Sequence, residues 1–133
     1  MVRFFCALAI ALMPLAATAE DAPLSAEAFE TYVEGKTLSF SNRFGPFGAE
    51  DYLEGRRVRW SYLDGECLEG RWYPEGSHIC FVYDDIPTPQ CWSFYLTGGA
   101  LMARFENRPG GTELYETAEL DEPLMCLGPR IGA

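Results

Sequence analysis

Four cysteines carry the chemistry in this chain that is easiest to interpret: Cys67, Cys80, Cys91 and Cys126. A structural zinc site usually takes its ligands in closely spaced pairs, whereas 12, 10 and 34 residues separate these cysteines. A Cys-x-x-Cys redox motif is absent from the sequence as well. The spacing therefore favours disulfide bonds and predicts neither a metal site nor any other cofactor.

Geometry favours one of the three possible pairings. A hairpin centred between Asp85 and Ile86 would place Cys80 directly opposite Cys91, close enough to bridge. The remaining pair is Cys67 with Cys126, which would tie the C-terminal tail to a strand. In the loop-entropy model the two closures are worth about 3 and 4 kcal/mol, respectively.

Few residues are candidates for catalysis. His78 has no nucleophile or acid partner supplied by a local motif, and we expect a partly exposed residue next to a turn. The acidic residues Asp84 and Asp85, or Glu66 and Glu69, could in principle hydrolyse a glycosidic bond. Neighbouring strand residues point to opposite faces, so Asp84 and Asp85 are better explained as turn formers. We predict no catalytic residue.

The N-terminus has the three parts of a secretory signal peptide. Arg3 supplies the positive charge, residues 4–12 form an apolar run, and Ala17-Thr18-Ala19 is a small-residue cleavage site. Cleavage would leave a single domain over residues 20–133 and remove the fifth cysteine, Cys6, with residues 1–19. The run is shorter than the roughly 20 residues that span a bilayer. We therefore expect a periplasmic or secreted protein without membrane insertion after cleavage.

Charge excludes some partner classes. The chain has 10 basic and 20 acidic residues, and loss of Arg3 would change its net charge from −10 to −11. Nucleic acids and anionic lipid surfaces need a basic footprint. The composition thus argues against both, while it leaves open a protein partner or a small apolar ligand.

Alternation of apolar and polar residues predicts a mainly β fold. Residues 24–35 have the Ser25 cap, the apolar spacing and the terminal Gly35 of one short helix. Residues 42–48 read as a loop, and the tail after Glu116 lacks alternation. Trp60, Trp72 and Phe94 lie on apolar faces and should be core residues. The expected strands are 36–41, 57–62, 67–73, 78–83, 91–96, 101–105 and 112–116.

Regular spacing with a turn at each junction predicts an antiparallel meander curled toward a small barrel, with one N-terminal helix. On the face opposite Trp60 and Trp72, large contact side chains recur. This possible binding face comprises Arg57, Arg59, Arg71, Tyr73 and Tyr95. The alternative is that its arginines pair with nearby acids.

Gly70-Arg71-Trp72 is similar to the G-x-W motif of lipocalins, small exported barrels that bind apolar ligands. In lipocalins the motif lies on the first strand, whereas here it is mid-chain. A core Trp beside a Gly that lets the sheet bend is the interpretation that the sequence favours. The order of features resembles a family of small bacterial exported proteins of unknown function. They share a helix ending in a step like Gly35-Lys36-Thr37, a G-x-W strand, and cysteines on consecutive strands. This resemblance implies a compact periplasmic β domain and brings no catalytic residue.

The sequence as a whole favours an exported, non-catalytic binding module for a protein or a small apolar ligand. Two alternatives remain: a hydrolase that acts on envelope polymers through carboxylates, and a protein inhibitor of a hydrolase. A ligand binder should have a cavity lined by aromatic side chains. An enzyme should have two or more buried carboxylates that converge in a cleft.

Overall fold

The computed structural model describes Met1 and residues 22–127. Apart from Met1, the predicted signal peptide, with Cys6 and the cleavage site, lies outside the described residues. The fold is mainly β, as predicted, with one short α-helix. The elements are α1 (Ala26–Val33), β1 (Thr37–Asn42), β2 (Gly45–Tyr52), a 3₁₀ turn η1 (Glu54–Arg56), β3 (Arg57–Ser61), β4 (Leu68–Glu75), β5 (His78–Tyr83), β6 (Ile86–Thr97), β7 (Ala100–Phe105) and β8 (Glu113–Leu120).

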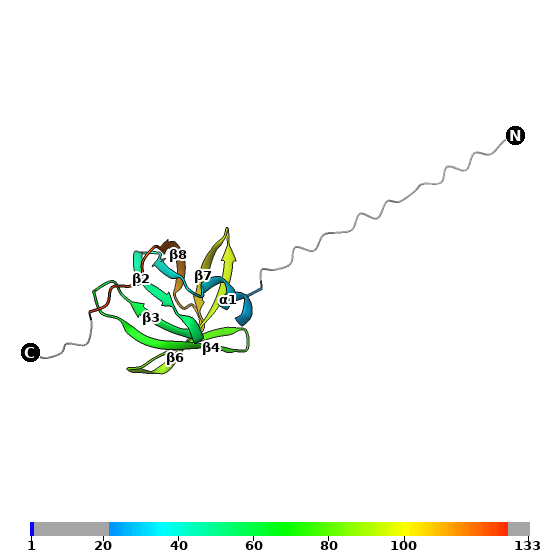
Figure 1. Ribbon diagram of the computed structural model, residues 1–133. Coiled ribbons are helices and arrows are strands. Elements are labelled where there is room, and N and C mark those ends of the chain that lie inside the picture. The colour runs from blue at the N-terminus through cyan, green and yellow to red at the C-terminus, as the bar shows by residue number, and fades with distance from the viewer. Residues whose placement is uncertain (2–21, 128–133) are drawn as a thin grey trace, which may run out of the picture.

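The strands form a closed antiparallel barrel (Figure 1). Each strand pairs with the next in the chain, and β8 pairs with β1 to close the sheet. In the part of the chain that the structure describes, closure leaves no free sheet edge for another chain to extend. It also divides the side chains of every strand into an inward and an outward set, and the inward set builds the core.

The helix α1 covers one end of the barrel (Figure 1). Ser25 caps it by accepting a hydrogen bond from the Ala28 amide at 3.1 Å. Phe29 is fully buried, and its ring meets the rings of Trp72 and Phe94 at 5.1 and 4.4 Å. Gly35 then takes a positive φ of 79° and starts the turn into β1. The predicted helix is confirmed, and its apolar face acts as a plug.

The predicted loop at residues 42–48 is wrong, because most of it belongs to the hairpin of β1 and β2. Only Arg43 and Phe44 form the turn, and β2 begins at Gly45. Pro46 is tolerated in this strand because the pairing with β1 shifts register there, between Phe40 and Ser41. The glycine and proline residues of this stretch favoured a loop in the sequence, although the stretch forms a strand of the barrel wall.

Two other strands are longer than predicted. β6 starts at Ile86 despite Pro87 and Pro89, at a register shift with β5, and leaves only Asp84 and Asp85 as the turn. β8 continues past Glu116 to Leu120, where it pairs with Thr37 of β1. Residues 117–120 are all exposed, so apolar and polar side chains do not alternate in this part of β8.

The predicted core residues Trp60, Trp72 and Phe94 are all buried. Gly70 lies two residues before Trp72 on β4, and a Cβ at its position would collide with the Val82 carbonyl and the Tyr83 ring. The Gly-x-Trp pattern therefore reflects close packing of β4 on β5 beside a core tryptophan.

Both disulfides join the cysteines that were predicted to pair. Cys80 and Cys91 are direct partners on β5 and β6, with Cα atoms 4.0 Å apart. Cys67 and Cys126 have Cα atoms 5.5 Å apart and tie the tail to the start of β4. Disulfides of this kind are typical of a protein that folds in an oxidising compartment outside the cytoplasm. Across residues 22–127, no helix has the length and apolar character needed to cross a membrane.

Candidate functional site

The interior of the barrel contains a cavity of about 90 Å³. A single water needs about 10–15 Å³, so the cavity can hold more than one water or a compact organic group. Its walls come from β1 through β8, and nine of its lining residues are aromatic. The lining residues are Phe40, Phe47, Glu50, Tyr52, Trp60, Tyr62, Leu68, Phe81, Tyr83, Gln90, Trp92, Phe94, Ala103 and Leu114.

The mouth of the cavity lies at the end opposite α1. The helix packs on Tyr52 at the end of β2, whereas Phe47, which also lines the cavity, lies near the start of that strand. Tyr62 follows β3 at the same end, is 54% exposed, and meets the Phe47 ring edge-on at 5.7 Å. These two aromatic side chains therefore form part of the rim.

Among residues 22–127, Glu50 is the one acidic residue that lines the cavity. Only 2% of it is exposed, and both of its carboxyl oxygens lie 3.0 Å from the Tyr83 hydroxyl. Burial raises the pKa of Glu50 well above its usual value, although the hydrogen bond from Tyr83 opposes this. Glu50 thus holds its proton to a higher pH than an exposed glutamate does.

The two tyrosines beside Glu50 are also held in their neutral form. Burial, followed by the nearby Glu50 charge, raises the pKa of Tyr52 and that of Tyr83 well above 10. The cavity therefore offers aromatic surface together with a small polar group made of one carboxyl and two phenols.

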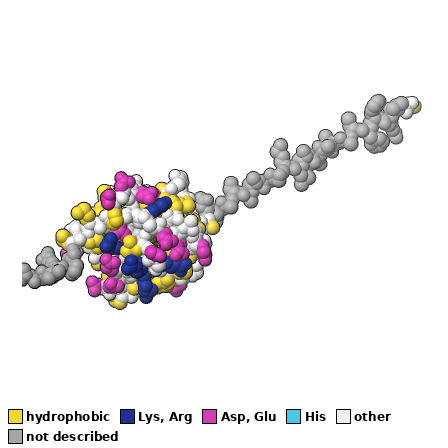
Figure 2. Space-filling model, in the orientation of Figure 1, with side chains coloured by type: hydrophobic (Ala, Val, Ile, Leu, Met, Phe, Trp, Pro, Cys, Tyr) yellow, Lys and Arg dark blue, Asp and Glu magenta, His cyan; other side chains and the backbone are white. Residues whose placement is uncertain are grey.

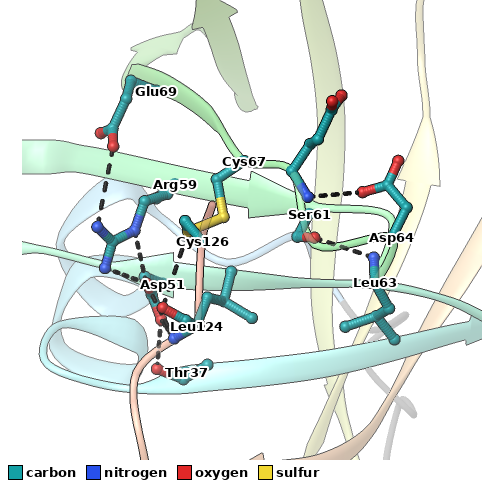
Figure 3. The surroundings of a disulfide bond; sticks show 11 residues. Thr37, Asp51, Arg59, Ser61, Leu63, Asp64, Cys67, Glu69, Leu124 and Cys126 are labelled. Carbon is teal, nitrogen blue, oxygen red and sulfur yellow. Dashed lines mark hydrogen bonds and ion pairs between the residues drawn. A yellow bond between two sulfur atoms is a disulfide. The ribbon is translucent and has the colours of Figure 1, made fainter. Parts of the chain in front are cut away.

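Asp51, next in sequence, points out of the barrel. It accepts hydrogen bonds from the Thr37 hydroxyl at 2.6 Å, from the Arg59 guanidinium at 2.8 Å and from the Leu124 amide at 3.1 Å (Figure 3). Asp51 thus binds the tail to β1 and β3 next to the Cys67–Cys126 disulfide. Because Glu50 and Asp51 lie on opposite faces of β2, these buried carboxylates do not converge as a hydrolytic pair would.

The predicted binding face does not form one cluster. Arg59 pairs with Asp51 and lies 3.9 Å from Glu69, so its charge is engaged within the protein (Figure 3). Arg57 and Arg71 are exposed neighbours across β3 and β4.

The two tyrosines of that face lie apart. Tyr73 shares β4 with Arg71, whose guanidinium is 5.8 Å from the Tyr73 ring centre, but Tyr95 is on β6, beyond β5. On the side of the molecule shown in Figure 2, basic side chains lie among acidic ones. The alternative prediction was that the arginines of this face pair with nearby acids. Arg59 does so, with Asp51 and Glu69.

The remaining polar candidates stay separate from the cavity. His78 is the first residue of β5 and half-buried, as expected next to a turn. Asp84 and Asp85 form the exposed β5–β6 turn, and Glu66 and Glu69 are exposed on the outside. None of these side chains lines the space around Glu50.

One group of possible metal ligands occurs among the described residues, formed by Glu75, Cys80 and Cys91. The two sulfur atoms are joined in a disulfide. Since metal binding by cysteine requires a thiolate, this group does not fit a metal in the oxidised protein.

Sequence reasoning missed Glu50 and Tyr83. Glu50 lies in a stretch that was not assigned to a strand, although Gly48, Glu50 and Tyr52 alternate with Ala49 and Asp51. Tyr83 was placed on a strand, and its parity with Phe81 was the available signal that it faces inward.

Comparisons with known proteins give no relative: no protein-family model, no curated protein and no solved structure matches this chain. The geometry of the barrel is therefore the basis for inferring function.

Proposed function

We propose that this protein binds a compact, mainly apolar ligand in the interior of its barrel. The observation that carries the proposal is the cavity itself, which is lined by nine aromatic residues and has one buried carboxyl at its wall. Small-molecule sites are typically concave and apolar with a few placed polar groups.

The volume limits the ligand. An engineered apolar cavity of about 150 Å³ is known to bind benzene, and the cavity here is about 90 Å³. The ligand is therefore a small molecule, or the end of a longer one whose remainder leaves the barrel past the rim that Phe47 and Tyr62 help to form. Dispersion contacts and burial of apolar surface would supply most of the affinity.

A hydrolase is supported less well, since Glu50 and Asp51 diverge. An inhibitor would need an exposed face, and Arg59 of the predicted face is already paired with Asp51. For the setting, we place the mature protein in the periplasm or outside the cell, supported by the signal-like N-terminus and two disulfides. The resemblance to exported bacterial proteins of unknown function agrees with this placement.

The proposal is tested by filling the cavity. Ala103 lies on its wall and is 2% exposed, so Ala103→Leu should occupy the space a ligand needs. In an NMR titration with 1-butanol, the wild type should show saturable shifts at the indole groups of Trp60 and Trp92. Ala103→Leu should weaken this binding by about tenfold or more, because the three added carbons replace ligand contacts.

The matched control is Ala118→Leu, which adds the same atoms at an exposed position on β8. Binding by the control should equal that of the wild type. Equal binding by Ala103→Leu, or no saturable shift in the wild type, would show that the cavity is not the site.

A further inference from the structure

We propose that the ligand carries a protonated amine, and that Glu50 is its counter-ion inside the aromatic cavity. This inference rests on the proposed function and specifies the chemical class of the ligand.

The first argument is that Glu50 has unused capacity to accept hydrogen bonds. A carboxylate offers about four lone-pair positions, and the one hydroxyl of Tyr83 supplies a single proton to the two oxygens. Buried acids are normally paired with a cation or with several donors. Among the described residues, Glu50 has neither a salt bridge nor a second hydrogen-bond donor. An ammonium group, with its three N–H donors, would complete this site.

The second argument is the surroundings of that carboxyl. Trp60, Phe81 and Trp92 line the same space. The face of an aromatic ring attracts a cation, and the attraction is strongest when water is excluded. Aromatic rings around one acid thus offset the free energy that a cation loses when it leaves water.

The third argument is the absence of any group that would favour an anion. Within residues 22–127, no Lys, Arg or His lines the cavity. Arg59, on the strand next to Glu50, points outward to Asp51. An anionic ligand such as a carboxylate would lie beside Glu50 without a counter-charge, which is unfavourable in a buried site.

The titratable groups around Glu50 agree with this assignment. Tyr83 of β5 and Tyr52 of β2 line the cavity, and Tyr62 follows β3 at the rim. Asp51 lies on the outer side of β2. Glu116 of β8 acts on Tyr52 from a distance and accepts a hydrogen bond from Tyr32 of α1. The cavity residues of β1, β4, β6 and β7 are not titratable. None of these groups can acquire a positive charge, so none of them opposes a cation beside Glu50.

Binding then has a defined proton balance. A primary alkylammonium is protonated to about pH 10, like the lysine side chain. Burial raises the pKa of Glu50, so at a pH where Glu50 is protonated, entry of the ammonium must release that proton to solvent and leave an ion pair. No bond of the ligand is broken.

The test compares n-butylamine with 1-butanol, which have similar shape, by isothermal titration at about pH 8, where the amine is protonated. The wild type should bind n-butylamine more tightly than 1-butanol by about tenfold or more. Glu50→Gln, which keeps the side-chain shape, should abolish that preference and still bind 1-butanol. The control Glu122→Gln, at an exposed position in the tail, should behave like the wild type.

A second measurement needs no variant. Below the pKa of Glu50, titrations in buffers of different ionisation enthalpy should report release of a proton when n-butylamine binds the wild type, and no release with 1-butanol. Binding of 1-butanol without a preference for the amine would overturn this inference and leave the proposed function standing. An amine preference that survives in folded Glu50→Gln would also overturn it. If neither probe binds, both proposals fail.

Discussion

Glu50 shows most clearly how a single residue departs from the rest of the core. It is 2% exposed in an interior built from aromatic and aliphatic side chains, and its hydrogen-bond partner is Tyr83. An apolar residue at this place would avoid the cost of burying an acid. The binding function that we propose would account for this cost, because the carboxyl could orient a ligand that would otherwise meet only apolar surface.

The pH dependence of stability should report this buried acid. The pKa of Glu50 is raised above 4.5 in the folded protein, so between 4.5 and the folded value the native state holds a proton that the unfolded state has lost. The free energy of unfolding must then decrease as pH rises, by at most about 1.4 kcal/mol per pH unit for this one group. Urea unfolding at several pH values should show that Glu50→Gln removes this decrease. A wild type and variant with parallel pH profiles would mean that Glu50 titrates normally.

Trp72 should be among the most sensitive core positions. Its ring lies edge-on to Phe29 at 5.1 Å and under the Arg56 guanidinium at 4.5 Å. Trp72→Ala would leave a void below the helix plug and should lower the free energy of unfolding by about 3–5 kcal/mol. Denaturant unfolding measures the change. A loss under about 1 kcal/mol would mean that the plug adjusts to fill the space.

Sequence patterns identified some of these residues and not others. The cysteines and core tryptophans could be predicted because oxidation, spacing and alternation constrain them locally. Glu50 could not be, because an acid in a sequence with 20 acidic residues gives no sign of burial. Its burial depends on the register of β2 against β3, where it lies opposite Trp60.

At the scale of elements, the missed strand β2 is the most instructive. Gly45, Pro46 and Gly48 are typical of loops, yet they lie within β2. Gly48 is required there, since a Cβ would collide with the Trp60 ring. Both the glycine and the proline are explained only by their neighbours on β3 and β1, which the local sequence does not reveal.

The two disulfides should differ in their contribution to stability. Cys67–Cys126 closes 59 residues and holds the tail against Asp51, whereas Cys80–Cys91 closes 11 residues inside one hairpin. By loop entropy, replacing the first pair with alanines should cost about 4 kcal/mol and replacing the second about 3 kcal/mol.

Thermal and urea unfolding of the two double variants measure this difference. The variant without Cys67–Cys126 should also lose protection of the Leu124 amide from hydrogen exchange, because that amide is held by Asp51. Retained protection would show that Asp51 holds the tail without the disulfide.

At the scale of the whole molecule, the closed barrel explains why a chain of this size keeps an internal cavity. Eight strands enclose an interior just wide enough for side chains to fill or for one small ligand, and α1 covers one end. The meander and its tendency to curl were predictable from strand spacing. Closure was not, since it depends on the pairing of β1 with the extended β8.

The net charge of the whole chain, −10, is of the same sign as Glu50. A negative protein raises the local concentration of cations and speeds their approach, so the field favours the class of ligand that we propose for the cavity. High salt should weaken the long-range attraction of cations to the protein much more than the pairing of a bound cation with Glu50, because buried pairs are screened less.

The most direct test of the account is to locate a bound ligand by intermolecular nuclear Overhauser effects with 1-butanol in the wild type. Binding inside the barrel predicts contacts from the ligand methyl group to the rings of Phe81 and Trp60, which line the cavity. Contacts to Arg71 and Tyr73 on the outer face of β4 would contradict it.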